Sequence, residues 1–341
     1  VIPDAPLSHS RLLAALTAMS TATATAAAAA ASTSLSSSTL CRSSPSSSIL
    51  ANPRRSLPGR LLSSSAAQFP LGPVSAMATP GASAEGASRK NLLIFDAEED
   101  LSASLAEHTA GLSEKFVAER GAFTVVLSGG SLIKALRKLA EPPYLEAVDW
   151  SRWHVFWADE RVVPKDHADS NYKLAMDGFL SKVPVPANQI HAMNDTLAAE
   201  GAAADYESCL NQLMKNGVIA SSPATGFPKF DLMLLGMGPD GHIASLFPGH
   251  PIVHENQKLV TYVEDSPKPP PERITFTFPV INSSAHIALM VTGAGKAGAV
   301  HKTLSGNELS SDLLPVEMIE PQDGEMTWFT DKQAVSMLSS L

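Results

Sequence analysis

The stretch FDLMLLGMGPDGHIASLFPGHP, residues 230–251, joins an apolar run typical of a buried strand to a glycine-rich loop. Gly236, Gly238 and Gly241 spell G-x-G-x-x-G directly after that run. This pattern allows two interpretations, a dinucleotide-binding turn or a catalytic loop built around His242. The choice between them decides which kind of α/β fold, and which chemistry, the sequence encodes.

Three features argue against a dinucleotide site. Pro248 and Gly249 would stop a helix starting at Gly241 after about two turns, too short for the crossover helix that the fingerprint requires. Asp240 would place a carboxylate against a pyrophosphate, where like charges repel. The motif also lies late in the folded region, although Glu264 follows at nearly the spacing of a ribose-binding acid. The catalytic loop is therefore the favoured interpretation.

The catalytic interpretation centres on His242. A strand is predicted to end at Leu235, after which the glycines allow a sharp turn with His242 at the start of a short helix. The positive end of that helix would disfavour an imidazolium and keep the ring neutral near neutral pH. A neutral imidazole accepts protons, so His242 is a candidate general base. The alternative is a structural histidine that only caps the turn.

A metal site is another use for the acids and histidines of this region. Asp240, His242, His250 and His254 could supply ligands. The sequence offers no His-x-x-x-His pair on a predicted helix and no CxxC partner, so we expect no metal ion.

From residue 89 onward, short apolar runs alternate with segments of helical periodicity. This alternation is typical of an α/β protein with a largely parallel, Rossmann-like sheet, and we expect one domain over residues 89–341. Loops that leave the carboxyl ends of parallel strands share one edge of the sheet, so we expect the ligand at that edge. The predicted strands are 92–95, 123–127, 154–158, 230–236, 259–263, 274–278 and 286–292, and the predicted helices are 97–119, 132–139, 171–180, 197–216 and 297–304.

The N-terminal segment has a different composition. Residues 5–84 contain no Asp or Glu, are rich in Ser, Ala and Thr, and carry a few arginines as their only charges. Such a composition is typical of an organelle transit peptide, so we expect residues 1–88 to be a disordered transit peptide and linker. Low Arg density and high Ser/Thr content favour the plastid stroma over the mitochondrion. The alternatives are a cytosolic product starting at Met77 and plain disorder without an address.

The overall composition excludes several classes of partner. The formal net charge of the 341 residues is −9, and no basic cluster with interleaved aromatics occurs, so nucleic acid is not expected as a partner. No run of about 18 apolar residues predicts a membrane span. Cys41 and Cys209 are the only cysteines, which favours a reducing compartment. An anionic ligand would need a local cationic pocket.

The stretch FTVVLSGGSLIKALRKLA runs from a predicted strand into a predicted helix through Ser128, Gly129, Gly130 and Ser131. Exposed backbone N–H groups, hydroxyls and a helix start together form a suitable phosphate cradle. The Lys-Ser/Thr ending of a P-loop is missing, so a nucleoside triphosphate is not implied. The alternative is an ordinary turn with Ser131 as N-cap.

The stretch WHVFWADERVVPKDHADSNY places Asp159, Glu160 and Arg161 just after another strand. Arg161 can pair with a phosphate or carbonyl oxygen, and Asp159 can hold Arg161 or His242 in position. Glu160 is expected in a surface salt bridge, and Ser170 is expected to cap the following helix.

Three further cations lie in loops that would reach the same edge. Lys268 and Arg273 flank the stiff segment of DSPKPPPERITFTFP, and Lys296 lies in the glycine-rich turn of TGAGKAGAVHKTL. Solvated surface positions are the alternative for each. In an acidic chain, three cations on strand-end loops nevertheless indicate an anionic ligand.

The motifs LSGGS, WADERVVP, LLGMGPDGHIASLFPGHP, SPKPPPERITFTFPVIN and TGAGKA together resemble 6-phosphogluconolactonase, a family related to glucosamine-6-phosphate deaminase. The resemblance covers residues 92–338. It implies a three-layer α/β/α fold that hydrolyses 6-phospho-D-glucono-1,5-lactone without a metal or organic cofactor. SGGSLI stands where relatives often carry SGGSTP, so we expect the loop after Ser131 to be shaped differently.

The resemblance also implies roles for single residues. His242 corresponds to the base that activates water, and Asp159 and Arg161 complete the catalytic set. The partner implied is a small phosphosugar lactone, with the protein a monomer or weak homo-oligomer. The implied substrate-binding residues are Ser128, Gly129, Gly130, Ser131, Asp240, Gly241, Lys268, Arg273 and Lys296.

Two rival functions remain open at this point. An aminosugar-phosphate deaminase on the same scaffold would resemble the chain at SGG and GxDGHIA, but such enzymes carry Phe-Asn-Glu-Pro where this sequence has SLFP. The acid expected to take part in ring opening is therefore missing. A non-catalytic sugar-phosphate sensor would keep the same pocket without turnover.

Overall fold

The computed structural model describes residues 90–305 and 312–338. The transit peptide and linker expected at residues 1–88 lie outside the described residues, and so does the predicted boundary at residue 89.

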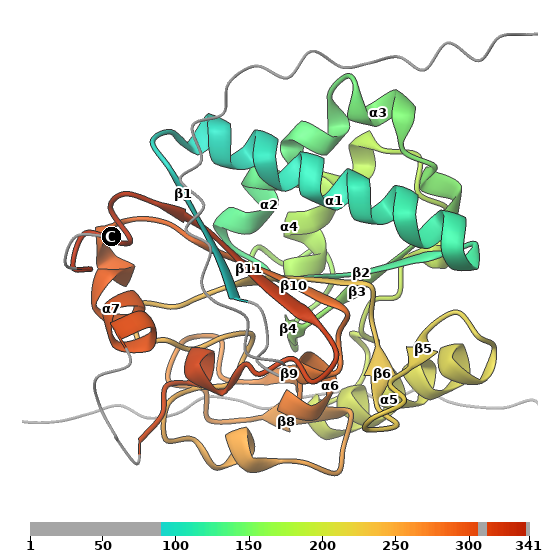
Figure 1. Ribbon diagram of the computed structural model, residues 1–341. Coiled ribbons are helices and arrows are strands. Elements are labelled where there is room, and N and C mark those ends of the chain that lie inside the picture. Colours follow the sequence, from blue (N-terminus) through green and yellow to red (C-terminus); the bar gives the residue numbers. More distant parts are fainter. Residues whose placement is uncertain (1–89, 306–311, 339–341) are drawn as a thin grey trace, which may run out of the picture. The chain divides into compact units, whose positions relative to one another are not determined.

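A six-stranded sheet, parallel throughout, forms the centre of the fold (Figure 1). Its strand order is β1-β11-β10-β7-β2-β3, so the last strand inserts beside the first. Most of the inner strands are largely apolar because both faces of the sheet are covered. The strands are β1 (Lys90–Phe95), β2 (Phe123–Leu127), β3 (Trp153–Trp157), β7 (Leu232–Gly236), β10 (His286–Val291) and β11 (Glu325–Asp331).

Alternate residues of these strands enter two separate hydrophobic cores. Leu232 and Leu234 of β7 point into one core, whereas Met233 and Leu235 point into the other. The period of two along an extended chain produces this division. The predicted α/β architecture with a parallel sheet and two covered faces is therefore confirmed.

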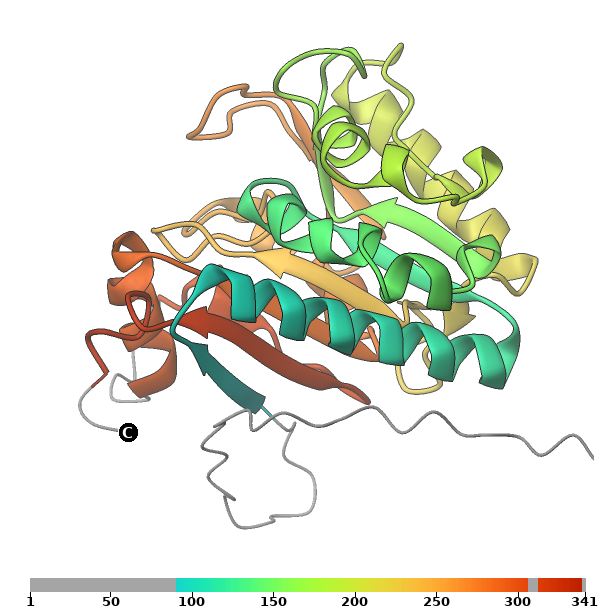
Figure 2. The same cartoon turned by 90° about the horizontal axis from the view of Figure 1, so that it is seen from above.

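Figures 1 and 2 show the layers on the two faces. One face carries α1 (Glu98–Arg120), α2 (Ser131–Ala135), α3 (Tyr144–Ala147) and α4 (Asn171–Gly178). The other carries α5 (Ala199–Lys215), α6 (Phe278–Asn282), α7 (Ala297–Ser305) and a small second sheet. Short 3-10 segments lie at Leu136–Ala140, Trp150–Arg152, Leu180–Lys182, Ala187–Gln189, Pro251–His254, Ala294–Lys296 and Pro315–Met318.

The second sheet is antiparallel and corrects part of the prediction. It consists of β4 (Asp159–Arg161), β9 (Arg273–Phe276) and β8 (Val260–Val263), in that order. The strands predicted at 259–263 and 274–278 exist, but they pair with each other and with β4 rather than with the central sheet. A hairpin of β5 (Ala220–Ser221) and β6 (Pro228–Lys229) precedes β7.

Two other expectations about elements were wrong. No helix starts at His242; isolated bridges between Met237, Ile243 and Leu246 fold this loop back on itself instead. β11, which lies between β1 and β10, was not predicted as a strand. No helix within residues 90–305 and 312–338 combines the length and apolarity needed to cross a bilayer.

Candidate active site

The predicted site residues come from loops at one edge of the parallel sheet. The turn at 128–131 follows β2, β4 follows β3, the His242 loop follows β7, and the turn before α7 follows β10. Because these strands are parallel, their carboxyl ends share that edge. The segment that contains Lys268 reaches the same place through β9, which pairs with β4.

A tight turn holds His242. The N–H of Gly238 donates to the His242 carbonyl at 2.8 Å, and the N–H of Gly241 donates to the Gly238 carbonyl at 3.0 Å. A Cβ at residue 238 would overlap the His242 imidazole, so only glycine fits there. Gly241 has φ of 80°, a left-handed conformation that favours glycine. The glycines of the motif therefore serve close packing around the histidine.

Asp240 and Lys268 both contact His242. Nδ1 of His242 lies 2.5 Å from Oδ1 of Asp240, and Nζ of Lys268 lies 3.0 Å from both atoms. Burial raises the pKa of the Asp240 carboxyl, but hydrogen bonds from His242 and Lys268 outweigh it and bring the pKa to about 2. An ionised carboxylate can only accept hydrogen bonds, so we assign the proton of the neutral imidazole to Nδ1 of His242. Nε2 is then the nitrogen with a free lone pair.

The imidazole is held in its neutral form. Burial lowers the pKa of His242, the Asp240 carboxylate opposes this, and the positive charge of Lys268 lowers it further. The ring also packs on Phe247, with centroids 4.8 Å apart. The expectation of a neutral histidine is thus supported, but the expected cause, a helix terminus, is wrong. Burial and a neighbouring cation take its place.

Asp159 does not contact His242 or Arg161 directly. Its buried carboxylate accepts a hydrogen bond from the Ser245 hydroxyl at 2.7 Å, and Ser245 in turn accepts one from Nη1 of Arg273 at 3.3 Å. Sequence reasoning missed Ser245, because its partner lies 86 residues away along the chain. The relay joins the His242 loop to the second sheet.

Two arginines lie side by side without a carboxylate partner. Arg161 and Arg273 are directly opposite in the pairing of β4 with β9. Arg273 is 3% exposed and donates to carbonyls of residues 268–270, while Arg161 donates to the Asp169 carbonyl at 2.9 Å. Nε of Arg161 is buried and has no partner. Within the described part of the chain neither forms an ion pair with an acid, which leaves positive charge for an anionic ligand.

Lys296 is a third cation of this kind. Its side chain is half-buried in the turn after β10. No carboxylate of residues 90–305 and 312–338 forms an ion pair with it. Burial lowers its pKa, and the charge of Lys268 lowers it further. Lys296 is therefore electrostatically coupled to the Asp240–His242–Lys268 cluster, as expected for one binding site.

The turn at 128–131 has the properties of an anion cradle. The Ser128 hydroxyl is buried and has no hydrogen-bond partner, which is unusual for a buried polar atom. Gly130, rather than Ser131, is the N-cap of α2, and no side chain caps that helix. The alternative of a simple Ser131 cap is therefore not observed.

Glu160 is not on the surface as expected. It is 4% exposed, and its carboxylate accepts N–H bonds from Arg161, Asn171 and Tyr172 at 2.8, 2.7 and 2.7 Å. Burial raises its pKa to about 7, and the N–H bonds oppose this rise. Ser170 caps α4 as predicted, accepting from the Lys173 N–H at 3.1 Å.

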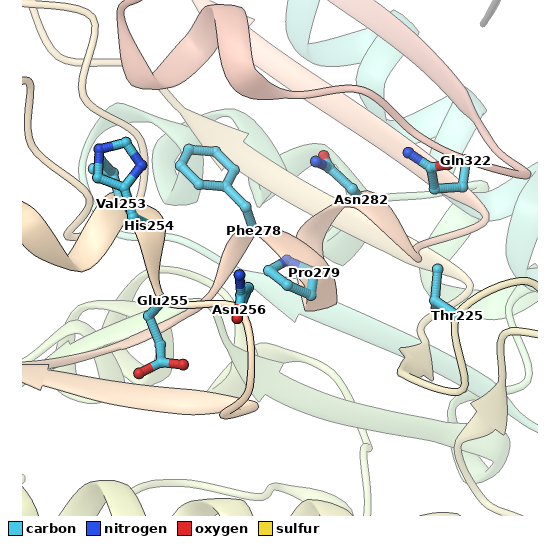
Figure 3. A pocket seen from close by; sticks show the side chains of 9 residues that line it. All are labelled: Thr225, Val253, His254, Glu255, Asn256, Phe278, Pro279, Asn282 and Gln322. Carbon is cyan, nitrogen blue, oxygen red and sulfur yellow. The ribbon is translucent and has the colours of Figure 1, made fainter.

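A separate pocket of about 490 Å³ lies between α6 and residues 253–256 (Figure 3). Its wall includes His254 and Asn282 but none of the predicted catalytic or substrate-binding residues. The alternative metal site of Asp240, His242, His250 and His254 is not formed; His250 bonds Asp265 at 3.0 Å instead. Across the described ranges, no three His, Cys, Asp or Glu side chains group so as to hold a metal ion.

The chain is similar to known proteins over most of its length. Residues 96–328 match the family of glucosamine-6-phosphate isomerases/6-phosphogluconolactonase. A rice protein (Oryza sativa subsp. indica) named probable 6-phosphogluconolactonase 3, chloroplastic, is 70% identical over 303 residues, or 87% of this chain and 93% of that protein. The chloroplastic 6-phosphogluconolactonase 3 of Arabidopsis thaliana is 58% identical over 265 residues, or 78% and 80%.

A solved structure agrees with these sequence relatives. The crystal structure of 6-phosphogluconolactonase from Thermotoga maritima has a TM-score of 0.59 at 28% identity and covers 72% of this chain and 100% of that one. The fold and the site define an α/β protein whose sheet edge carries a half-buried histidine among cations. The chain belongs to the glucosamine-6-phosphate isomerase/6-phosphogluconolactonase family.

Proposed function

We propose that this protein hydrolyses 6-phospho-D-glucono-1,5-lactone to 6-phosphogluconate, with His242 as the general base. The observation that carries the proposal is the Asp240–His242 pair, whose free Nε2 lies in a site with uncompensated Arg and Lys charges. The names of the rice, Arabidopsis and Thermotoga relatives support the same reaction. The partner is a small phosphosugar lactone, and the protein acts as a monomer or weak homo-oligomer, which light scattering would test.

The mechanism follows from the arrangement of these groups. Nε2 of His242 takes a proton from water as the water oxygen attacks the lactone carbonyl carbon. Asp240 stabilises the imidazolium that forms, and Arg161 or a loop N–H holds the developing oxyanion. The C1–O5 bond then breaks, and the ring oxygen takes the proton back from Nε2. No covalent intermediate is needed.

Binding energy comes from the phosphate. Lys268, Arg273 and Lys296, with the turn at 128–131, are the proposed contacts for the phosphate and the sugar hydroxyls. Anchoring the distal phosphate holds the carbonyl carbon in attack geometry, which lowers the entropic part of the barrier. The positive charge of the site acts against the net charge of −9 of the whole chain.

The first prediction concerns His242→Ala. We expect kcat to fall by roughly 10²- to 10⁴-fold, the usual contribution of a general base. The reaction is followed with freshly generated lactone by coupled reduction of NADP in excess 6-phosphogluconate dehydrogenase. His254→Ala, which changes an exposed histidine in the pocket of Figure 3, is the matched control and should retain full activity.

Each result has a clear consequence. Equal rates in the parent and a folded His242→Ala variant would remove this residue from catalysis. No acceleration by either protein would refute the lactonase, and ammonia release from glucosamine 6-phosphate would then identify a deaminase. Phosphate affinity without turnover of either compound would identify a sensor.

We also propose that the protein works in the plastid stroma. The acid-free composition of residues 5–84 and the chloroplastic names of the relatives support this location. A fusion of residues 1–88 to a fluorescent protein should be imported by isolated chloroplasts. Import by mitochondria alone would contradict the proposal.

A further inference from the structure

Asn171, the first residue of α4, contacts the segment that contains Asp159. Its side-chain Nδ2 donates to the Asp159 carbonyl at 3.0 Å, and its backbone N–H donates to the Glu160 carboxylate at 2.7 Å. Asn171 is 3% exposed, so water does not compete for these bonds. The residue is therefore fixed to β4 through two independent hydrogen bonds.

The same side chain packs against the turn at 128–131. A Cβ at residue 129 would lie 2.7 Å from Cγ of Asn171 and would overlap its Oδ1. Gly129 is not among the residues with positive φ, so the backbone there would accept alanine. The lack of space beside Asn171 is what requires glycine at this position. The adjacent Ser128 hydroxyl is the buried group that has no partner.

These contacts add a side-chain link between two loops whose parent strands are already joined, because the N–H of Ala158 donates to the Leu127 carbonyl at 2.9 Å. The turn follows β2 and β4 follows β3, and Asn171 comes from a third element, α4. α4 is itself held by Glu160, whose carboxylate accepts the N–H groups of its first two residues. Beyond the last paired residues of β2 and β3, one amide side chain thus links the proposed phosphate cradle to the Asp159–Arg161 segment.

We infer that Asn171 is a positioning residue that fixes the phosphate cradle at 128–131 relative to Asp159 and Arg161. This inference rests on the proposed lactonase function. Two anchoring points on one substrate give their full effect only at the right separation, and a displacement of about 1 Å costs on the order of 10²-fold in rate. The hydrogen bonds of Asn171 go to Asp159 and Glu160 and not to His242, the proposed base.

The test begins with Asn171→Ala in the full chain. We expect kcat/KM for the lactone to fall roughly 10- to 100-fold, mainly through KM, because the cradle loses its fixed place. The dissociation constant of inorganic phosphate, measured by calorimetry, should rise in parallel. Unchanged KM and unchanged phosphate affinity in a folded Asn171→Ala variant would overturn the inference.

A double-mutant cycle then tests the steric contact. Gly129→Ala alone should reduce kcat/KM at least as much as Asn171→Ala, because the new methyl group displaces the amide. In the double variant the overlapping atoms are gone, so its loss should not exceed that of Asn171→Ala. Losses that multiply would show that the two residues act independently and would contradict the proposal.

Asn282→Ala is the matched structural control. Asn282 also donates to one carbonyl, that of Met318, and accepts from one N–H, that of Glu320, but it lines the separate pocket of Figure 3. It should lower Tm without changing KM or phosphate affinity. If Asn171→Ala behaves in the same way, its role is structural only.

Failure of the inference is distinguishable from failure of the proposed function. A parent protein without lactonase activity refutes the function, while phosphate calorimetry still shows whether Asn171 shapes the cradle. An active parent with an unaffected Asn171→Ala variant refutes only the positioning role.

Discussion

Three neighbours set the state of the His242 imidazole. Asp240 determines which nitrogen carries the proton, Phe247 packs on the ring, and Lys268 brings a positive charge to 3.0 Å from Nδ1. A base close to a cation is harder to protonate, which keeps it in the accepting form at lower pH. The same cation is also a proposed contact for the substrate.

Lys268→Gln tests the effect of Lys268 on the pKa of His242 separately from its proposed contact with the substrate. Removing the positive charge should raise the pKa of His242, because Lys268 is one of the causes that lower it. The acid limb of the pH profile of kcat/KM, which requires a neutral base, should therefore move to higher pH. Lys268→Arg retains the charge and should leave the limb in place. A limb that stays fixed or moves to lower pH in Lys268→Gln would contradict this account.

The role of some site residues could be predicted from the sequence, and that of others could not. His242 could be predicted from the sequence because glycines and an acid lie close to it within one loop. The roles of three other residues could not be predicted, because they come from burial or from contacts with segments far along the chain. These residues are Ser245, Glu160 and Asn171. Asp240 was expected to contact substrate, whereas its nearest partner is the imidazole two residues away.

Secondary-structure elements were predictable where a local pattern was strong. The prediction for β2 matches its bounds, the one for β3 is shifted by one residue at both ends, and the one for β10 is one residue too long. These strands are predictable because they are short, largely apolar runs. The helix predicted at 97–119 is likewise observed as α1.

Pairing between elements was not predictable from local pattern. The runs at β8 and β9 indicate strands equally well for a parallel or an antiparallel sheet. Their assignment to the second sheet depends on β4, which is only three residues long. β11, with the sequence EMTWFTD, mixes polar and apolar residues, yet it lies between β1 and β10. Only the packed chain selects these partners.

Stability of the whole molecule should depend on two half-buried histidines, His108 and His191. Burial lowers the pKa of His108 to about 4, with a further effect of His286, and burial and His154 lower that of His191 to about 4. Between pH 6.5 and 4 each binds fewer protons folded than unfolded, so stability present above pH 6.5 is lost as pH falls. The raised pKa of Glu160 acts in the opposite direction below about 7.

We therefore expect the free energy of unfolding to decrease on acidification through this window, by up to about 3 kcal/mol for each histidine. His108→Leu should flatten the dependence, since it removes one titrating group beside Phe329. Urea unfolding at a series of pH values measures the slope, with the exposed His254→Leu as control. An equal slope in the parent and His108→Leu would exclude His108 as a source.

The sequence by itself determined the α/β class, the family and the loop that carries His242. These depend on local patterns, namely apolar runs, helical periodicity and glycine spacing, which can be recognised in a single sequence. The tertiary structure alone decided which strands pair, why His242 is neutral, and how Ser245, Glu160 and Asn171 support the site. Burial and long-range contacts are properties of the folded chain, because they require segments far apart in sequence to exclude water together.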